Sequence, residues 1–245
     1  MARAAVRGRL NWRLAEVAEL VDETPGTRSI LLDVPEWPGH LPGQHVDVRL
    51  TAEDGYQAQR SYSIASAPEE PRLALTVELL EDGEVSPYLT RELRPGDRIE
   101  VRGPIGGYFV WTADLAGPLL LFAGGSGVVP LIAMLRHRAA AGATTPARLL
   151  YSARSLEDVI YREELERLDA EVVLTLTRAQ PPGWGGYARR IDEEMLREVA
   201  WPPDDSPHVF VCGPTRLVES VASALVAVGH DPALIKTERF GPTGG

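Results

Sequence analysis

The spacing of apolar and polar residues divides the chain into two halves. From Arg13 to about Val101, short segments of strand-like composition are separated by turn residues such as Thr24-Pro25-Gly26 and Pro95-Gly96-Asp97. Turns at this spacing let successive strands reverse direction, so the first half predicts an antiparallel β-barrel. The strands expected are 13–21, 29–34, 45–51, 59–66, 73–80 and 98–101, with one short helix over 86–93.

After Trp111 the pattern changes to apolar strands that alternate with segments of helix length. The strands expected are 119–123, 148–152, 172–177 and 209–212, and the helices are 129–141, 157–168, 192–199 and 215–228. This alternation favours a mostly parallel, Rossmann-like sheet covered by helices on both faces. The fold class expected is therefore a β-barrel domain over 1–113 followed by an α/β domain over 114–245, with the boundary near Ala113.

Composition excludes several classes of function. Asp and Glu number 35 against 25 Lys and Arg, a formal charge of −10, which argues against a nucleic-acid or anionic-membrane partner. The single cysteine, Cys212, excludes an internal disulfide or a four-cysteine iron-sulfur cluster within this chain. The histidines are scattered, so we expect no metal site. No segment resembles a secretory leader, which makes a cytoplasmic location the expectation.

One uncharged window, 118–135, has the length of a membrane-spanning helix. Gly124-Gly125-Ser126-Gly127 and Pro130 lie in its middle, where a spanning helix needs continuous backbone hydrogen bonds. A buried strand, a tight turn and a helix use such residues naturally. We therefore expect no membrane partner.

The turns after the parallel strands carry the candidate nucleotide-binding residues, because ligands of open parallel sheets bind beyond the strands' carboxyl ends. The glycine turn at 124–127 allows a pyrophosphate to approach the backbone at a helix start, although such a turn also serves packing alone. After the next strand, Ser152 and Arg154, with Tyr161 and Arg162 further on, suit the 2′-phosphate of NADP. The alternative for Arg154 is a surface ion pair with Glu157 or Asp158.

Polar and aromatic side chains on the barrel strand at 60–66 supply a second candidate site. Arg60 and Tyr62 point to one face of the strand, and Ser61 and Ser63 point to the other. A flavin needs this mixture of a cation for phosphate, an aromatic for the ring and a hydrogen-bond donor. Taken alone, the segment is also compatible with a plain polar edge strand.

Six motifs occur in an order that resembles the ferredoxin-NADP reductase superfamily, over residues 13–242. They are Arg60-x-Tyr62-Ser63, Gly83-x-Val85-Ser86, Gly103-Pro104-x-Gly106-x-x-Phe109, the glycine turn, Cys212-Gly213-Pro214-Thr215 and Glu238-Arg239-Phe240-Gly241-Pro242. The resemblance implies bound FAD, with FMN left open, and NAD(P)H as the electron donor. The sequence favours NADP(H) over NAD(H).

The resemblance also implies roles for individual residues. Arg60 and the 83–86 turn, with Gly83, Val85 and Ser86, would hold the flavin phosphates. Tyr62 would stack on the flavin ring beside Ser61 and Ser63, and the backbone at Val77 and Glu78 would contact its pyrimidine edge. Gly125, Ser126 and Gly127 would hold the NAD(P)H pyrophosphate, with Cys212, Gly213, Pro214 and Thr215 beneath the nicotinamide. Phe240 would shield the ring, and Ser63, Cys212 and Glu238 are the candidate catalytic residues.

The electron acceptor is the least specified feature. Relatives with a similar C-terminal tail often continue into an iron-sulfur domain. This chain lacks the cysteines of such a domain, so it is expected to be a stand-alone reductase that passes electrons to a separate ferredoxin or similar protein. Arg91, Arg94 and Arg98, with the arginine-rich N-terminus, are candidates for a local basic docking patch. A diaphorase, or a flavin or quinone reductase, is an alternative, and a non-catalytic ligand-binding or partner-binding subunit is an alternative of another class.

Overall fold

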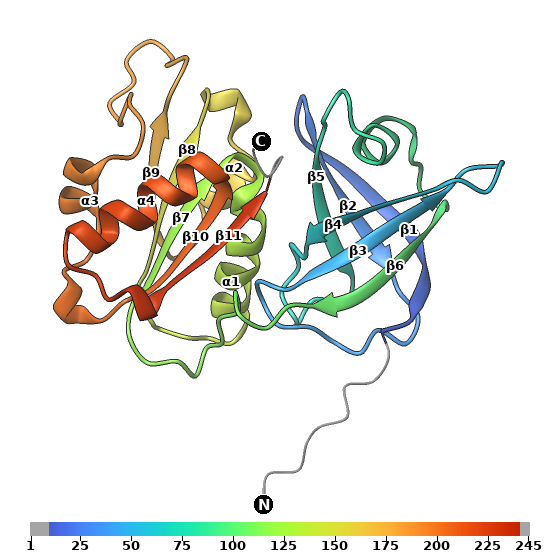
Figure 1. Ribbon diagram of the computed structural model, residues 1–245, viewed down its shortest axis with the longest axis horizontal. Coiled ribbons are helices and arrows are strands. Elements are labelled where there is room, and N and C mark those ends of the chain that lie inside the picture. The colour runs from blue at the N-terminus through green and yellow to red at the C-terminus, as the bar shows by residue number, and fades with distance from the viewer. Residues whose placement is uncertain (1–9, 241–245) are drawn as a thin grey trace, which may run out of the picture.

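The computed structural model describes residues 10–240 as two lobes that lie side by side, each built on its own sheet (Figure 1). The first lobe is an antiparallel sheet in the order β4-β3-β6-β1-β2-β5. Its strands are β1 (Trp12–Thr24), β2 (Thr27–Asp33), β3 (His45–Thr51), β4 (Gln57–Ser63), β5 (Leu73–Glu78) and β6 (Arg98–Ile105). A π-helical turn, η1 (Tyr88–Glu92), follows β5.

The two edges of this sheet meet and close it into a barrel. Ile64, directly after β4, forms an antiparallel bridge with Leu75 of β5. Apolar side chains that alternate along the strands fill the interior, and Ile30, Val48, Leu75 and Val101 are fully buried there. Closure brings β4 and β5 together, and these two strands carry the flavin-site candidates.

The second lobe is a parallel sheet in the order β11-β10-β7-β8-β9. Its strands are β7 (Leu119–Gly124), β8 (Ala147–Ala153), β9 (Glu171–Leu176), β10 (His208–Pro214) and β11 (Ile235–Phe240). Its helices are α1 (Val128–Ala140), α2 (Arg162–Leu165), α3 (Glu193–Val199) and α4 (Thr215–Ala227), with short 3-10 turns η2 (Gly125–Gly127), η3 (Leu156–Asp158), η4 (Pro203–Asp205) and η5 (Pro232–Leu234).

Helices cover both faces of the parallel sheet, as the apolar runs predict. Helix α1 packs on one face against Leu119 and Leu121, and α3 and α4 pack on the other against Leu120 and Phe122. In Figure 1, α1 lies on the side of the sheet that faces the barrel, and β11 ends between the two lobes. The expected fold class, a barrel followed by a helix-covered parallel sheet, is confirmed.

Three local expectations were wrong. The helix expected over 157–168 is reduced to the single turn of α2, because Tyr161 has a φ of 59° and interrupts it. Strand β4 ends at Ser63, three residues before the expected end. Strand β11 was not expected, since its sequence Ile-Lys-Thr-Glu-Arg-Phe is short and mostly polar. In residues 10–240, no helix has the length and apolar character needed to cross a membrane.

Candidate functional site

A cleft of about 1040 Å³ lies between the two lobes. The barrel contributes Arg60, Ser61, Tyr62 and Ser63 of β4, Thr76 and Glu78 of β5, and the loop that leads to Ser86. The parallel sheet contributes the turns after β7, β8 and β10 together with Phe240. Pockets that bind one drug-sized ligand have volumes of about 300–1000 Å³. The cleft is therefore at least as large as a pocket for one such ligand.

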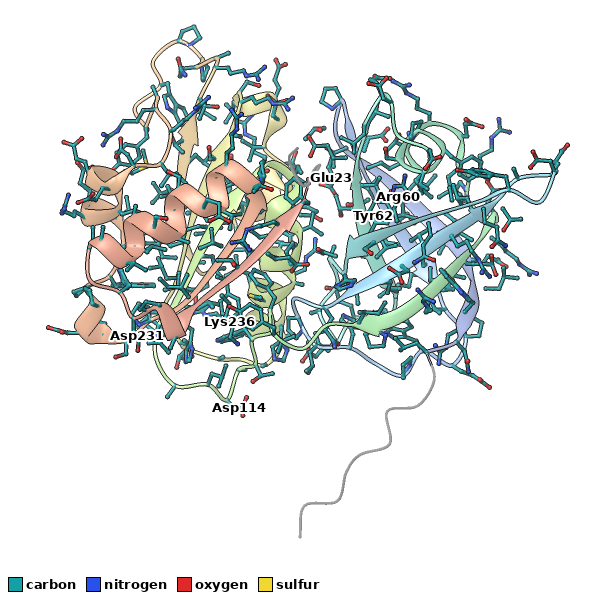
Figure 2. All side chains as sticks on the ribbon, viewed as in Figure 1. Glu23, Arg60, Tyr62, Asp114, Asp231 and Lys236 are labelled. Carbon is teal, nitrogen blue, oxygen red and sulfur yellow. The ribbon has the colours of Figure 1, made fainter. Side chains whose placement is uncertain are left out.

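The β4 segment of the barrel wall follows the predicted alternation. The Arg60 guanidinium donates to Glu84 at 2.5 Å, whereas Ser61 on the other face donates to Asp47 at 2.7 Å. Burial raises the pKa of Tyr62 to about 12, so its hydroxyl remains protonated. Figure 2 labels Arg60 and Tyr62 on the side of the barrel near the cleft. The wall thus offers a cation, an aromatic ring and hydroxyls to one ligand.

The turn at 83–86 forms the adjacent part of the barrel wall. Gly83, Val85 and Ser86 all line the cleft. The Ser86 hydroxyl accepts from the backbone N–H of Leu80 at 3.1 Å, which ties the loop to the turn. A Cβ on Gly83 would lie 2.9 Å from the Ser86 oxygen and 3.0 Å from the Leu80 carbonyl, so the turn has no space for a larger residue. This tight backbone beside Arg60 fits the diphosphate of FAD.

The glycine turn after β7 forms the opposite wall. Gly125 has a φ of +52°, a backbone conformation that favours glycine. A Cβ on Gly127 would lie 2.1 Å from the Cys212 carbonyl oxygen, because the turns after β7 and β10 touch there. Ser126 donates across the cleft to the Glu78 carboxylate at 2.7 Å. The turn is therefore in contact with both the nucleotide side and the barrel side of the cleft.

The arginines after β8 and β9 differ from the predicted pair. Ser152 and Arg154 line the cleft as expected. Arg162 does not line it, and its side chain is 3.5 Å from Glu166 on the same helix. Arg178 does not line the cleft either, but its backbone lies beside that of Arg154, since the Arg178 N–H donates to the Arg154 carbonyl at 2.9 Å. Within residues 10–240, neither Arg154 nor Arg178 forms an ion pair.

Tyr161 was also expected at the nucleotide phosphate, and the structure places it elsewhere. Its side chain is 4% exposed and its hydroxyl donates to Thr76 of the barrel. Arg178 follows the end of β9 much as Arg154 follows the end of β8. This position along the chain is the sequence signal for a second arginine near Arg154. Two adjacent parallel strands bring such residues to one edge of the sheet.

Cys212 and Glu238 lie opposite each other on the paired strands β10 and β11. Cys212 is 2% exposed, and burial raises the pKa of its thiol. Burial also raises the pKa of Glu238 to about 7, and its Oε2 has no hydrogen-bond partner among the described residues. The half-buried Glu238 does not line the cleft, but its raised pKa and unpartnered oxygen suit it to hold or release a proton near neutral pH.

The remaining candidates of this region are divided between the cleft and its surroundings. Pro214 and Phe240 line the cleft, whereas Cys212, Gly213, Thr215, Gly127 and Val77 do not. Gly241 and Pro242 of the C-terminal motif lie outside the described residues. The backbone of residues that do not line the cleft still shapes it, as the contact between Gly127 and Cys212 shows.

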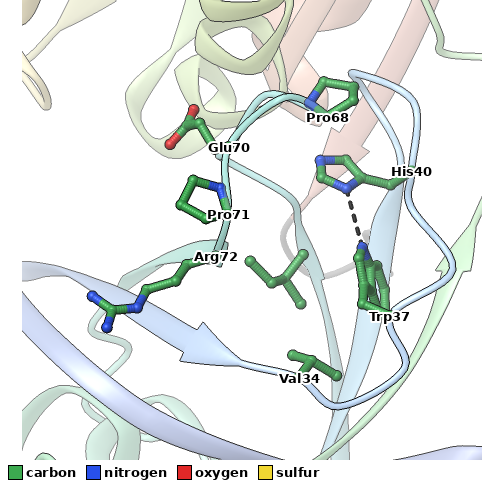
Figure 3. Close-up of a pocket in the computed structure, with 8 residues that line it drawn as sticks. Val34, Trp37, His40, Pro68, Glu70, Pro71 and Arg72 are labelled. Atoms are coloured by element: carbon green, nitrogen blue, oxygen red, sulfur yellow. Dashed lines mark hydrogen bonds between the residues drawn. The ribbon is translucent and has the colours of Figure 1, made fainter.

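A second hollow on the barrel is too small to hold a cofactor. It has a volume of about 40 Å³ and is lined by Trp37, His40 and Arg72, among others (Figure 3). The Trp37 indole N–H donates to His40 Nδ1 at 3.2 Å, and His40 Nε2 lies 3.0 Å from the Ser66 carbonyl. Both nitrogens of His40 are thus engaged in local structure.

Comparisons with known proteins agree with this geometry. A model described as an oxidoreductase FAD-binding domain matches residues 17–110, and one described as an oxidoreductase NAD-binding domain matches residues 121–223. Ferredoxin–NADP reductase B of Sorangium cellulosum is 41% identical over 188 residues, which cover 73% of this chain and 76% of that protein.

Two further comparisons extend the likeness over nearly the whole chain. The glycine betaine monooxygenase reductase subunit of Chromohalobacter salexigens is 33% identical over 96% of this chain, which spans only 65% of that protein. The flavohem-like FAD/NAD-binding domain of nitric oxide dioxygenase from Vibrio cholerae superposes with a TM-score of 0.83 at 24% identity, covering 94% of this chain and 99% of that one. The chain is therefore an FAD-dependent NAD(P)H oxidoreductase and belongs to the ferredoxin-NADP reductase superfamily.

Proposed function

We propose that this reductase takes its electrons from NADPH in preference to NADH and passes them to a separate iron-sulfur protein of the ferredoxin type. The pair Arg154 and Arg178 carries the preference for NADPH. Arg154 lines the cleft together with Ser152, and the Arg178 backbone is bonded to that of Arg154. Neither arginine forms an ion pair in the described chain, so the two guanidiniums would supply the charge and donors that a 2′-phosphate requires. Glu157 and Asp158 also line the cleft, but Asp158 accepts from Ser155 at 2.6 Å and Arg154 forms an ion pair with neither carboxylate.

The residues in and near the cleft then have the following proposed roles. Bound FAD supplies the redox chemistry, since a flavin accepts a hydride and releases electrons singly. Arg60, Gly83 and Ser86 hold the FAD diphosphate, Tyr62 packs on the ring, and Ser63 hydrogen-bonds at its edge. Gly125 and Ser126 bind the nicotinamide nucleotide, Phe240 covers the ring, and Glu238 exchanges a proton with the cleft. The boundary between the two domains is proposed near Ala113, between the two family matches.

The choice of acceptor is supported by the relatives more than by surface charge. The relatives include a ferredoxin–NADP reductase and an oxygenase reductase subunit. Of the three arginines expected to form a basic patch, Arg91 pairs with Glu81 at 2.6 Å and Arg98 pairs with Glu16 at 3.1 Å. Surface pairing reduces the field that attracts an acidic partner. Docking is therefore expected to depend on short-range contacts and to be only weakly sensitive to salt.

Two measurements test the proposal. Anaerobic titration of the purified protein should bleach the flavin at lower concentrations of NADPH than of NADH, and equal or better bleaching by NADH would refute the nucleotide preference. Steady-state turnover with a reducible ferredoxin should then exceed turnover with quinones or free flavin. Faster turnover with the small acceptors would assign the protein as a diaphorase, and a purified protein that takes up no flavin would remove the reductase assignment.

A further inference from the structure

Tyr161 combines a strained backbone with a buried side chain that crosses between the lobes. Its φ of 59° lies in the left-handed region, which a tyrosine rarely adopts, and its side chain is only 4% exposed. Such a conformation persists only where the surrounding contacts hold it. The tyrosine precedes α2 in the nucleotide-binding lobe, but its hydroxyl donates to Thr76 on β5 of the barrel.

The contact continues into the barrel as a directed chain of hydrogen bonds. The Thr76 and Ser29 hydroxyls are 2.8 Å apart, and Ser29 donates to the Glu23 carboxylate at 2.6 Å. Each hydroxyl has one hydrogen, so Ser29 is committed to Glu23 and Thr76 must donate to Ser29. Tyr161, at the far end, therefore donates to Thr76. Burial raises the pKa of Tyr161, which keeps its hydroxyl protonated and able to donate.

Helix α1 holds the same tyrosine from the other side. The Arg136 guanidinium lies 5.1 Å from the centre of the Tyr161 ring and forms two hydrogen bonds of 2.7 Å to Glu164. Its Nη1 also donates to the Ala65 carbonyl of the barrel at 2.9 Å. Thr76, Ser29 and Tyr161 are all at most 5% exposed. The contact is thus desolvated and held on both sides, which separates it from an incidental surface hydrogen bond.

The position of this contact links it to the nucleotide site. Thr76 lines the cleft on the barrel side. Ile160, directly before Tyr161, lines it on the nucleotide side together with Arg154. The segment after β8 that carries the NADPH phosphate candidates is therefore attached to the barrel through Tyr161.

We propose that Tyr161 is a positioning residue for hydride transfer, whose bond to Thr76 fixes the nucleotide-binding lobe against the FAD-binding barrel. Hydride transfer requires reacting atoms about 3–3.5 Å apart, and a displacement of about 1 Å is enough to cost a hundredfold in rate. The chain from Tyr161 to Glu23 acts on that separation and not on the affinity for either nucleotide. The inference concerns the reaction with NAD(P)H and is independent of the acceptor.

The test compares two tyrosines of the same lobe. Tyr161→Phe keeps the ring and removes the hydroxyl that crosses to the barrel. Tyr187→Phe is the control, because the Tyr187 hydroxyl donates to Glu198 at 2.6 Å within its own lobe and Tyr187 does not line the cleft. Both holoenzymes are mixed anaerobically with NADPH, and the limiting rate of flavin bleaching is separated from the apparent Kd.

For Tyr161→Phe, we expect a limiting rate about tenfold lower with an apparent Kd for NADPH within about twofold of wild type. The long-wavelength absorbance of nicotinamide stacked on flavin should weaken in parallel. Tyr187→Phe should leave both unchanged. Equal rates in the two variants, or a rise in Kd that accounts for the whole effect, would overturn the proposal.

A double-mutant cycle and a measurement without turnover complete the design. Thr76→Val should slow bleaching by itself, and the Tyr161→Phe/Thr76→Val double variant should be no slower than the slower single variant. Effects that multiply would mean that the two hydroxyls do not act through their bond. Amide hydrogen exchange of residues 73–78 in the barrel should speed up in Tyr161→Phe and not in Tyr187→Phe. Exchange in Tyr161→Phe equal to that of wild type would show that the bond does not couple the lobes.

Discussion

The two walls of the cleft recognise nucleotides by different means. On the barrel wall the key side chain is already held, since Glu84 accepts from Arg60 at 2.5 Å and from the Tyr56 hydroxyl at 2.6 Å. On the sheet wall the contacts come from a glycine turn and from exposed arginines without ion pairs in the described chain. Side chains held in place lose little entropy on binding, whereas exposed arginines must be ordered by their ligand. The difference suits a cofactor that stays bound on one wall and a nucleotide that exchanges on the other.

The largest effect should come from the sheet wall at Gly127. The Cβ of Gly127→Ala would lie 2.1 Å from the Cys212 carbonyl oxygen, so the turns after β7 and β10 must separate by more than 1 Å. We expect NADPH to reduce the bound FAD about a thousandfold more slowly or worse, while flavin content is retained. Gly107→Ala, which has open space around its Cβ, is the control. Loss of flavin together with the loss of rate would erase the distinction between the walls.

The second effect concerns Glu238, which lies on β11 of the parallel sheet beside Cys212 of β10. Its carboxyl has a pKa of about 7 in the folded protein and an ordinary value of 4.5. A raised pKa in an acid means that the folded state binds the proton more tightly than the unfolded state. The stabilisation of the folded protein by this proton is therefore complete below pH 4.5 and is lost as the pH rises to about 7. The free energy of unfolding of the wild type should fall by about 3 kcal/mol over this pH range, relative to that of Glu238→Gln.

Chemical denaturation of both holoenzymes at pH 4.5, 6 and 8 measures this difference. The two unfolding free energies should diverge between pH 4.5 and pH 7 and run parallel above it. Parallel curves across the whole range would mean that Glu238 titrates normally and has no special part in proton exchange.

The third effect should fall on the barrel wall alone. Arg60→Ala removes the cation proposed for the FAD diphosphate and leaves Glu84 in the turn. A charge-assisted hydrogen bond contributes about 1.5–3 kcal/mol, so the Kd for FAD should rise about ten- to a hundredfold. Fluorescence titration of the apoprotein with FAD measures it. Arg91→Ala is the control, because Arg91 pairs with Glu81 and does not line the cleft; a similar rise there would indicate a general charge effect.

The contrast between the walls also explains what the sequence predicted well and what it did not. The alternation on β4 and the glycine turn are local patterns, and both lie where they were expected. Tyr161 and Arg162 were misplaced because a left-handed residue interrupts the expected helix, and nothing in the apolar pattern signals that conformation. The pairing of Glu84 with Arg60 joins residues 24 positions apart, so it depends on barrel closure and not on local spacing.

The fourth effect separates the arginines that follow β8 and β9 from the one on α2. Arg154→Ala, which removes the arginine that lines the cleft, should raise the KM for NADPH about tenfold with little change for NADH, since only NADPH carries the 2′-phosphate. Arg178→Ala should behave in the same way. Arg162→Ala should leave both values unchanged, because Arg162 pairs with Glu166 on its own helix. Equal losses with both nucleotides would mean that Arg178 acts on the fold and not on the phosphate.

The smallest effect concerns the side-chain hydrogen bond between Ser126 of the glycine turn and Glu78 of the barrel wall. The Glu78 carboxylate accepts from Ser126 at 2.7 Å, at the place where the nucleotide pyrophosphate is proposed to bind. Two like charges about 4 Å apart in water repel by about 1 kcal/mol, so Glu78→Gln should lower the KM for both NADPH and NADH about fivefold. Glu92→Gln, an exposed acid outside the cleft, controls for the loss of one negative charge. A higher KM in Glu78→Gln would instead mean that the carboxylate holds Ser126 in its binding position, and the sheet wall would then depend on a side chain of the barrel.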